Sequence, residues 1–238
     1  MPSALSIDDF VPFSITCEVR YKNAYLIFDR TGKILEDLRE RFTELEISSA
    51  APQQTGFTAE EGTFNLEIGA CRFTSSQVDG SGEVFAKRCK MFFDTVAQHL
   101  NIAVFTRIGL RYIARKEFKT DDEAKAALAS LTLANLKPAK RFNSSDSPIE
   151  VSFRWEDKAI GTLFRLKAET TFVKMTVPPE LRAAVPKVDR KIVGLTLDID
   201  YYTAAPVERE QWEPDEWLRQ RLRIVKKEAE GILLGGGK

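Results

Sequence analysis

Residues 83–115, EVFAKRCKMFFDTVAQHLNIAVFTRIGLRYIAR, place an amphipathic helix directly before an alternating strand. In the first part, apolar residues recur every three or four positions, as on one helix face: Phe85, Cys89, Phe92, Val96 and Leu100. In the second part, the period falls to two, and Ile108, Leu110 and Tyr112 alternate with Arg107, Gly109 and Arg111. This change of period predicts a sheet that buries one face under a helix.

The same two periods recur along the rest of the chain. Alternating or compact apolar runs predict further strands at 15–21, 24–28, 64–76, 149–155, 160–175 and 191–203. Helical spacing predicts amphipathic helices at 32–45, with Thr31 as the N-cap, and at 214–233. Residues 47–59 carry no charge and indicate a loop or a weak edge strand. The pattern as a whole predicts an α+β fold in which antiparallel sheets carry amphipathic helices on one face.

Two pairs of segments suggest an internal repeat. ITCEVRY at 15–21 resembles IEVSFRW at 149–155, and RIGLRYI at 107–113 resembles KIVGLTLDI at 191–199. We therefore predict two similar α+β halves, 1–118 and 119–238, the second closing with the terminal helix 214–233. Chance similarity between short strands is the competing interpretation.

The composition is that of an ordinary globular chain. Lysine plus arginine and aspartate plus glutamate both number 35, so the formal net charge is zero, which removes the simplest argument for a nucleic-acid or membrane-surface protein. No apolar run has the length of a membrane helix, and residues 1–13 lack the pattern of a secretory leader. Three cysteines without paired spacing suit reduced thiols. We expect a cytoplasmic protein that does not associate with membranes.

Motifs for common enzyme chemistry are missing from the sequence. It contains no GxxxxGK[ST], GxGxxG or GxSxG motif, so phosphate loops and serine nucleophile elbows have no support. Its single histidine, His99, lies near the end of the helix at 82–100 without a nucleophile beside it. The sequence therefore predicts a binding protein without catalytic residues or a cofactor, and not an enzyme.

Asp198 and Asp200 form the most chemical-looking pair. They stand two residues apart on a predicted strand, so they share a face and could bind Mg²⁺ as part of a metal-dependent hydrolase. The alternative is a ladder of salt bridges across the sheet to Arg107, Arg111 and Arg115. We favour the ladder, because a metal site needs more ligands than two.

Charged and apolar residues also alternate along the other predicted strands, so the charged side chains share one face. If these strands share one sheet, its open face is rich in arginine and could bind a phosphate, a carboxylate or a nucleic acid. The candidate binding residues on this face are Arg107, Arg111, Arg154, Arg165 and Lys167. The default interpretation is a solvated face whose charges neutralise each other, because antiparallel sheets commonly leave one side in water.

The terminal helix supplies a second candidate surface. Its apolar stripe either packs on the sheet or contacts a second subunit, which would make the protein a homo-oligomer. Trp212 and Trp217 flank its start and could anchor a protein partner, although closing a core is the commoner role of tryptophan.

Two segments resemble a known family. Arg107 to Ile113, RIGLRYI, and Leu197 to Tyr202, LDIDYY, are similar to segments of a sporadically distributed bacterial family of proteins of about this length and of unassigned function. The family's usual asparagine after RYI is Ala114 here. The resemblance implies a bacterial protein, such as an accessory or defence-associated factor, and transfers no catalytic residue.

The leading hypothesis is a non-enzymatic protein that binds a macromolecular partner, with a protein as the expected partner. The contact surface would be the charged face of the sheet or the terminal helix. Binding of a nucleic acid or nucleotide by the arginine-rich face is the alternative, and a metal-dependent hydrolase is the least favoured function.

Overall fold

The described strands of this chain form a single antiparallel sheet. The computed structural model describes residues 5–22, 24–51, 53–77, 81–131, 149–174 and 189–235. Within them, nine strands follow the order β2-β3-β4-β5-β1-β6-β9-β8-β7, and β10 pairs with β6 as a tenth. The strands are β1 (Val11–Tyr21), β2 (Glu46–Ala51), β3 (Gln54–Ala59), β4 (Gly62–Glu67), β5 (Ala70–Ser75), β6 (Val104–Phe118), β7 (Glu150–Glu156), β8 (Ile160–Lys174), β9 (Asp189–Thr203) and β10 (Val207–Glu208).

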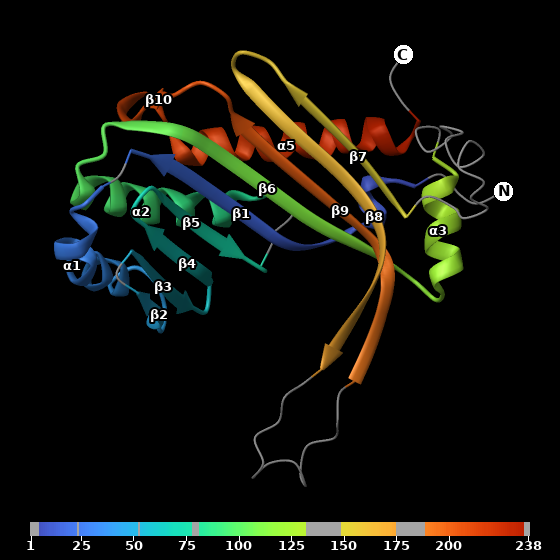
Figure 1. Cartoon of the computed structure of the whole chain (residues 1–238), viewed down its shortest axis with the longest axis horizontal. Coiled ribbons are helices and arrows are strands. Elements are labelled where there is room, and N and C mark those ends of the chain that lie inside the picture. The colour runs from blue at the N-terminus through green and yellow to red at the C-terminus, as the bar shows by residue number, and fades with distance from the viewer. Residues whose placement is uncertain are drawn as a thin grey trace, which may run out of the picture.

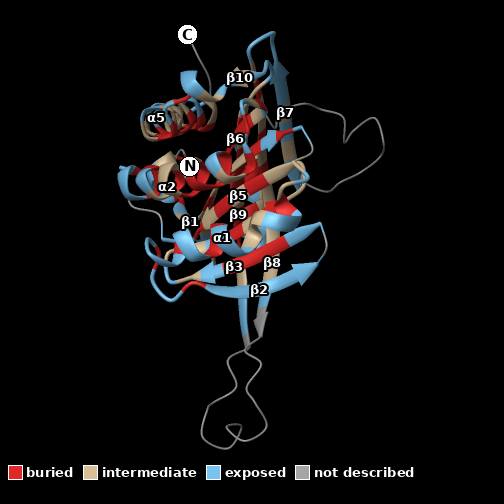
Figure 2. Ribbon diagram, turned by 90° about the vertical axis from the view of Figure 1, so that its left-hand side faces the viewer, coloured by how far each residue is buried: buried red, intermediate tan, exposed pale blue. Residues whose placement is uncertain are grey.

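Helices cover one face of this sheet and leave the other open. The helices are α1 (Ile27–Arg39), α2 (Glu83–Leu100), α3 (Asp121–Ala129) and α5 (Pro214–Leu233). Figure 1 shows α2 and α5 behind the sheet and α3 at one end of its long strands. The buried residues lie between the sheet and these helices (Figure 2). The predicted α+β class is confirmed, and no described helix is long and apolar enough to cross a membrane.

The core between sheet and helices contains a cluster of packed aromatic rings. Phe64 on β4 stacks on Phe73 of β5, with 4.6 Å between ring centroids, and its ring lies 5.1 Å from that of Phe92 on α2. The three free cysteines, Cys17, Cys71 and Cys89, are also buried in this core. The apolar faces predicted from the sequence are therefore the faces that pack together.

The chain segments 1–118 and 119–238 share the sheet through two pairings of β6, a long one with β9 and a short one with β10. Ten consecutive residues of β6, Gly109 to Phe118, are in register with Val193 to Tyr202 of β9. This pairing joins the sheet across the proposed boundary. The common origin of two similar halves stays a prediction.

The prediction of a strand at 24–28 is wrong, because this segment leads into α1, which begins at Ile27. Ile27 is buried while Tyr25 and Phe28 are exposed, so only one side of the apolar run faces the core. Thr31, the predicted N-cap, lies inside the helix, where its hydroxyl donates to the carbonyl of Ile27. A short apolar run cannot by itself distinguish a strand from the first turn of a helix.

The uncharged segment 47–59 forms two strands. Its first strand, β2, is exposed along its whole length and makes one edge of the sheet, whereas β3 buries Phe57. Of the two alternatives predicted for this segment, a loop or an edge strand, the structure selects the edge strand for β2.

We predict that Phe64→Ala lowers the free energy of unfolding by about 3–5 kcal/mol, because it leaves a cavity among packed rings. Phe28→Ala is the control, since this side chain is exposed on α1. Urea denaturation followed by tryptophan fluorescence measures both changes. Equal losses for the two variants would contradict the assignment of the core.

Candidate anion-binding groove

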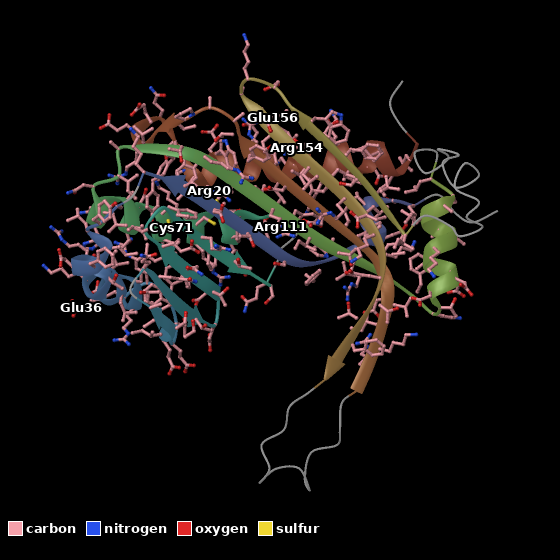
Figure 3. The ribbon with its side chains drawn as sticks, viewed as in Figure 1. Arg20, Glu36, Cys71, Arg111, Arg154 and Glu156 are labelled. Atoms are coloured by element: carbon pink, nitrogen blue, oxygen red, sulfur yellow. The ribbon has the colours of Figure 1, made fainter. Side chains whose placement is uncertain are left out.

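The open face of the sheet contains a groove with a volume of about 560 Å³. Strands β5, β1, β6, β9 and β8 all contribute to its lining. Its charged residues are five arginines and three carboxylates: Arg20, Arg72, Arg107, Arg111, Arg165, Glu18, Asp198 and Asp200. We call this feature the arginine groove. Figure 3 places Arg20 and Arg111 on the face that is turned to the viewer, with α2 and α5 behind the sheet.

Strand alternation puts these side chains on the open face. On β6, Ile108, Leu110 and Tyr112 are buried beneath the helices, so Arg107 and Arg111 project to the other side. On β9, Asp198 lies opposite Arg165 of β8, and Asp200 lies opposite Arg111. The two carboxylates therefore stand in the middle strand, between arginines on both neighbours.

Ion pairs connect the three strands. Nε and Nη2 of Arg111 donate to Oδ1 and Oδ2 of Asp198, each at 2.8 Å, in a bidentate pair. Arg165 Nη1 lies 3.6 Å from Asp198 Oδ2, and Arg107 Nη2 donates to Asp200 Oδ2 at 2.8 Å. The predicted salt-bridge ladder is confirmed for Arg107 and Arg111.

Arg115 does not join this ladder. The residue opposite Arg115 on β9 is Thr196. Arg115 Nη2 instead donates to Glu169 Oε1 of β8 at 3.0 Å. The ladder therefore ends at Asp198, and Arg115 belongs to a separate cluster.

The charges of the arginine groove lie in two layers. The side chains of Arg111 and Arg165 are 50% and 38% exposed, whereas that of Asp198 is only 12% exposed. Arg107 and Asp200 do not differ in this way, since their side chains are 24% and 28% exposed. Around Asp198, solvent therefore meets guanidinium groups, and the carboxylate lies underneath and holds them. A nearly balanced set of charges presents a mainly positive surface.

Burial affects the pKa of Asp200 more strongly than the neighbouring Arg107 does. Removal from water raises the pKa of Asp200, and the Arg107 guanidinium only partly offsets that rise. The hydrogen bonds that Arg111 donates to Asp198 raise the pKa of Arg111, so this guanidinium stays charged. The positive layer therefore persists across the physiological pH range.

A second groove continues the first toward β7. It has a volume of about 410 Å³, shares Arg107 and Asp200 with the arginine groove, and adds Arg154, Glu156 and Tyr202. Tyr202 donates its hydroxyl proton to Glu156 Oε2 at 2.6 Å, and Arg154 Nη2 lies 2.6 Å from the same oxygen. The two grooves together run from Arg72 on β5 to Arg154 on β7.

Both faces of the Tyr202 ring are covered. The guanidinium carbon of Arg107 lies 4.1 Å from the ring centroid. A Cβ on Gly161, the residue opposite on β8, would come within 2.2 Å of Tyr202 Cζ, so the ring rests on the glycine backbone. A side chain at 161 would displace the Tyr202 ring from this position, and the ring already has Arg107 and the Gly161 backbone packed against it.

The other candidate binding residues differ in position. Lys167 lies on the open face of β8, where its Nζ is 3.2 Å from Glu169 Oε2. Trp212 is buried, and its ring lies 5.6 Å from Phe93 and 5.1 Å from Phe105 between centroids. The interpretation of Trp212 as a partner anchor is therefore wrong, because its side chain closes the core.

Trp217 and the terminal helix also face inward. Trp217 is half-buried, with its ring near those of Trp212 and Tyr201. The apolar stripe of α5, which includes Leu218, Leu222 and Val225, is buried against the rest of the fold. Part of the helix surface stays open, because Ile224 and Ile232 of α5 line an apolar pocket of about 330 Å³ together with the exposed Trp155 of β7.

The weak metal alternative at Asp198 and Asp200 gains no further ligands. Across the described ranges of the chain, no three His, Cys, Asp or Glu side chains gather in a way that could hold a metal ion. Arginines occupy both oxygens of Asp198 and Oδ2 of Asp200 instead.

Arg72, Glu156 and Tyr202 belong to the two grooves but were not selected as site residues from the sequence. Arg72 stands between buried Cys71 and Phe73, so the alternation alone could have placed it on the open face. The hydrogen bond between Tyr202 and Glu156 joins residues 46 positions apart. No local signal in the sequence points to that contact.

Comparisons with known proteins supply no relative with an assigned role. No family model matches the chain, and no curated protein is significantly similar to it. One solved structure, the di-domain ARO/CYC StfQ from the steffimycin biosynthetic pathway, is 11% identical over 93% of this chain and 95% of its own. Its TM-score of 0.18 is too low to indicate a shared fold.

We predict that Asp200→Asn gains stability relative to the wild type as the pH rises from about 3 to about 7. Because burial raises the pKa of Asp200, the wild type loses stability as this carboxyl ionises, whereas asparagine does not ionise. Urea denaturation at several pH values measures the difference, with Glu36→Gln on the exposed side of α1 as the control. Parallel pH curves for Asp200→Asn and the wild type would contradict the prediction.

Proposed function

We propose that this chain is a binding protein that holds a negatively charged segment of a partner protein in the arginine groove. The layering of charges carries the proposal: exposed guanidinium groups of Arg111 and Arg165 lie over the less exposed carboxylate of Asp198. Guanidinium groups fixed on strands are well suited to bidentate contacts with carboxylate or phosphate. On this proposal Asp198 and Asp200 position arginines and do not perform chemistry.

The extent of the two grooves suits an extended segment. They span six neighbouring strands, β5 to β7 in sheet order, which at the usual strand spacing is about 24 Å. An extended peptide of about seven residues covers that distance. The combined volume exceeds what one small anion fills.

A protein partner fits this surface better than a nucleic acid. Proteins that bind single strands use free aromatic rings on which bases stack. Tyr202 is the aromatic residue that lines these grooves in the described part of the chain, and both faces of its ring are covered. The zero net charge of the whole chain also gives no general attraction to nucleic acid.

We further propose that the chain belongs to the bacterial family that its segments 107–113 and 197–202 resemble. Both segments lie in the arginine groove, and they supply Arg107, Arg111, Asp198 and Asp200. The resemblance therefore falls on the residues that build the ladder. An accessory or defence-associated role in a bacterium would suit the sporadic occurrence of that family.

We predict that Arg111→Glu/Arg165→Glu abolishes capture of the partner from a bacterial lysate at low salt. Arg223→Glu/Lys227→Glu is the matched control, because it makes the same change of charge on the exposed side of α5. Arg20→Glu/Arg154→Glu tests the groove without leaving Asp198 unpaired. Quantitative mass spectrometry compares the captured proteins, and thermal melting checks that each variant is folded.

Two labelled probes decide the class of partner. Heptaglutamate should bind the wild type and the α5 variant but not the groove variants, as measured by fluorescence anisotropy. Captured proteins that are the same for all variants would sink the proposal. Tight, strongly salt-dependent binding of oligodeoxythymidine, lost in the groove variants, would replace the protein partner by a nucleic acid.

A further inference from the structure

We propose that the centre of the arginine groove is a site for a phosphomonoester dianion, formed by Arg107, Arg111 and Arg165. The inference rests on the proposed function of the groove as an anion-binding surface and specifies the group that it recognises. A phosphorylated side chain of the partner is one source of that group, and a nucleotide 5′-phosphate or free phosphate is another.

Unused donors at the centre of the groove support this assignment. Asp198 and Asp200 accept from Nε and Nη2 of Arg111 and from Nη2 of Arg107. Within the described residues, no hydrogen bond is found for Arg107 Nη1, Arg111 Nη1 or Arg165 Nη2, although Arg165 Nε lies 3.3 Å from Glu150 Oε1. Each of the three arginines therefore keeps a terminal amino group that can donate to a ligand in the groove.

The number of acceptor oxygens favours a phosphomonoester over a carboxylate. The groove lining holds five arginines and three carboxylates, and the neighbouring Glu67 and Glu150 also pair with Arg72 and Arg165. A phosphomonoester carries a charge of about −1.5 to −2 near neutral pH and presents three strong acceptor oxygens. A side-chain carboxylate brings one charge and two oxygens, so it cannot give each of the three arginines an oxygen of its own.

Asp198 is the positioning residue of this site. Its two oxygens hold Nε and Nη2 of Arg111, which fixes the plane of the guanidinium and turns Nη1 outward. Its Oδ2 also lies near Arg165, so one carboxylate orients donors from both neighbouring strands. Asparagine offers one acceptor oxygen in place of two and carries no charge, so it cannot hold Arg111 in this way.

Isothermal titration calorimetry of the full chain at low salt tests the preference. The probes are a short acidic peptide with one phosphoserine, the same peptide with glutamate or serine there, AMP, and inorganic phosphate. We expect the phosphoserine peptide to bind at least about tenfold more tightly than the glutamate peptide. Tighter binding of AMP than of the peptide would support the site and identify a nucleotide as the source.

Substitutions separate positioning from simple attraction. Asp198→Asn and Glu36→Gln each remove one negative charge, so an effect of net charge alone would raise the affinity for phosphate in both variants. We expect Asp198→Asn to lower that affinity by about tenfold and Glu36→Gln to leave it unchanged. Arg111→Lys, which keeps the charge but loses the planar fork, should also lower it and decides the matter if Asp198→Asn does not fold.

Equal affinity for the phosphoserine and glutamate peptides would overturn this inference and leave the proposed function intact. An increase in phosphate affinity in folded Asp198→Asn, or no change in Arg111→Lys, would also overturn it. Loss of all peptide binding in the wild type would instead contradict the proposed function itself.

Discussion

The two-residue period of the strands gives the single sheet two faces of opposite chemistry. Ile108, Leu110 and Tyr112 of β6 are buried beneath the helices, and the same strand must then present Arg107 and Arg111 to the other side. Burial of the apolar face supplies the stability of the fold. The charged face follows from the same alternation, so the groove and the core are two consequences of one pattern.

The burial of each charged side chain on the open face determines whether it orients a neighbour or meets the solvent. Removal of Asp198 and Asp200 from water is costly, and the arginines of β6 and β8 offset that cost. Each guanidinium is thereby held by one edge and keeps another edge for solvent or a ligand. Flexible surface pairs would not confer this geometry, because exposed ion pairs contribute little and hold no fixed orientation.

Long alternating or helical segments could be predicted from the sequence. The strand that contains Arg107 and Arg111, the helix that begins near Pro214 and the α+β class are all found in the structure. The strand expected at 24–28 is a helical turn, since five apolar residues carry no decisive period. Trp212 is buried against α2 and β6, a location that no local pattern around it indicates.

The sequence by itself determined which side chains share a face, because that depends only on the period of each strand. It also predicted the pairing of Arg107 and Arg111 with acids two residues apart. Only the tertiary structure decided that β9 lies between β6 and β8, which places Asp198 within reach of Arg111 and Arg165 together. Strand order joins residues far apart in the chain, so the depth of each charge and the shape of the groove come from packing.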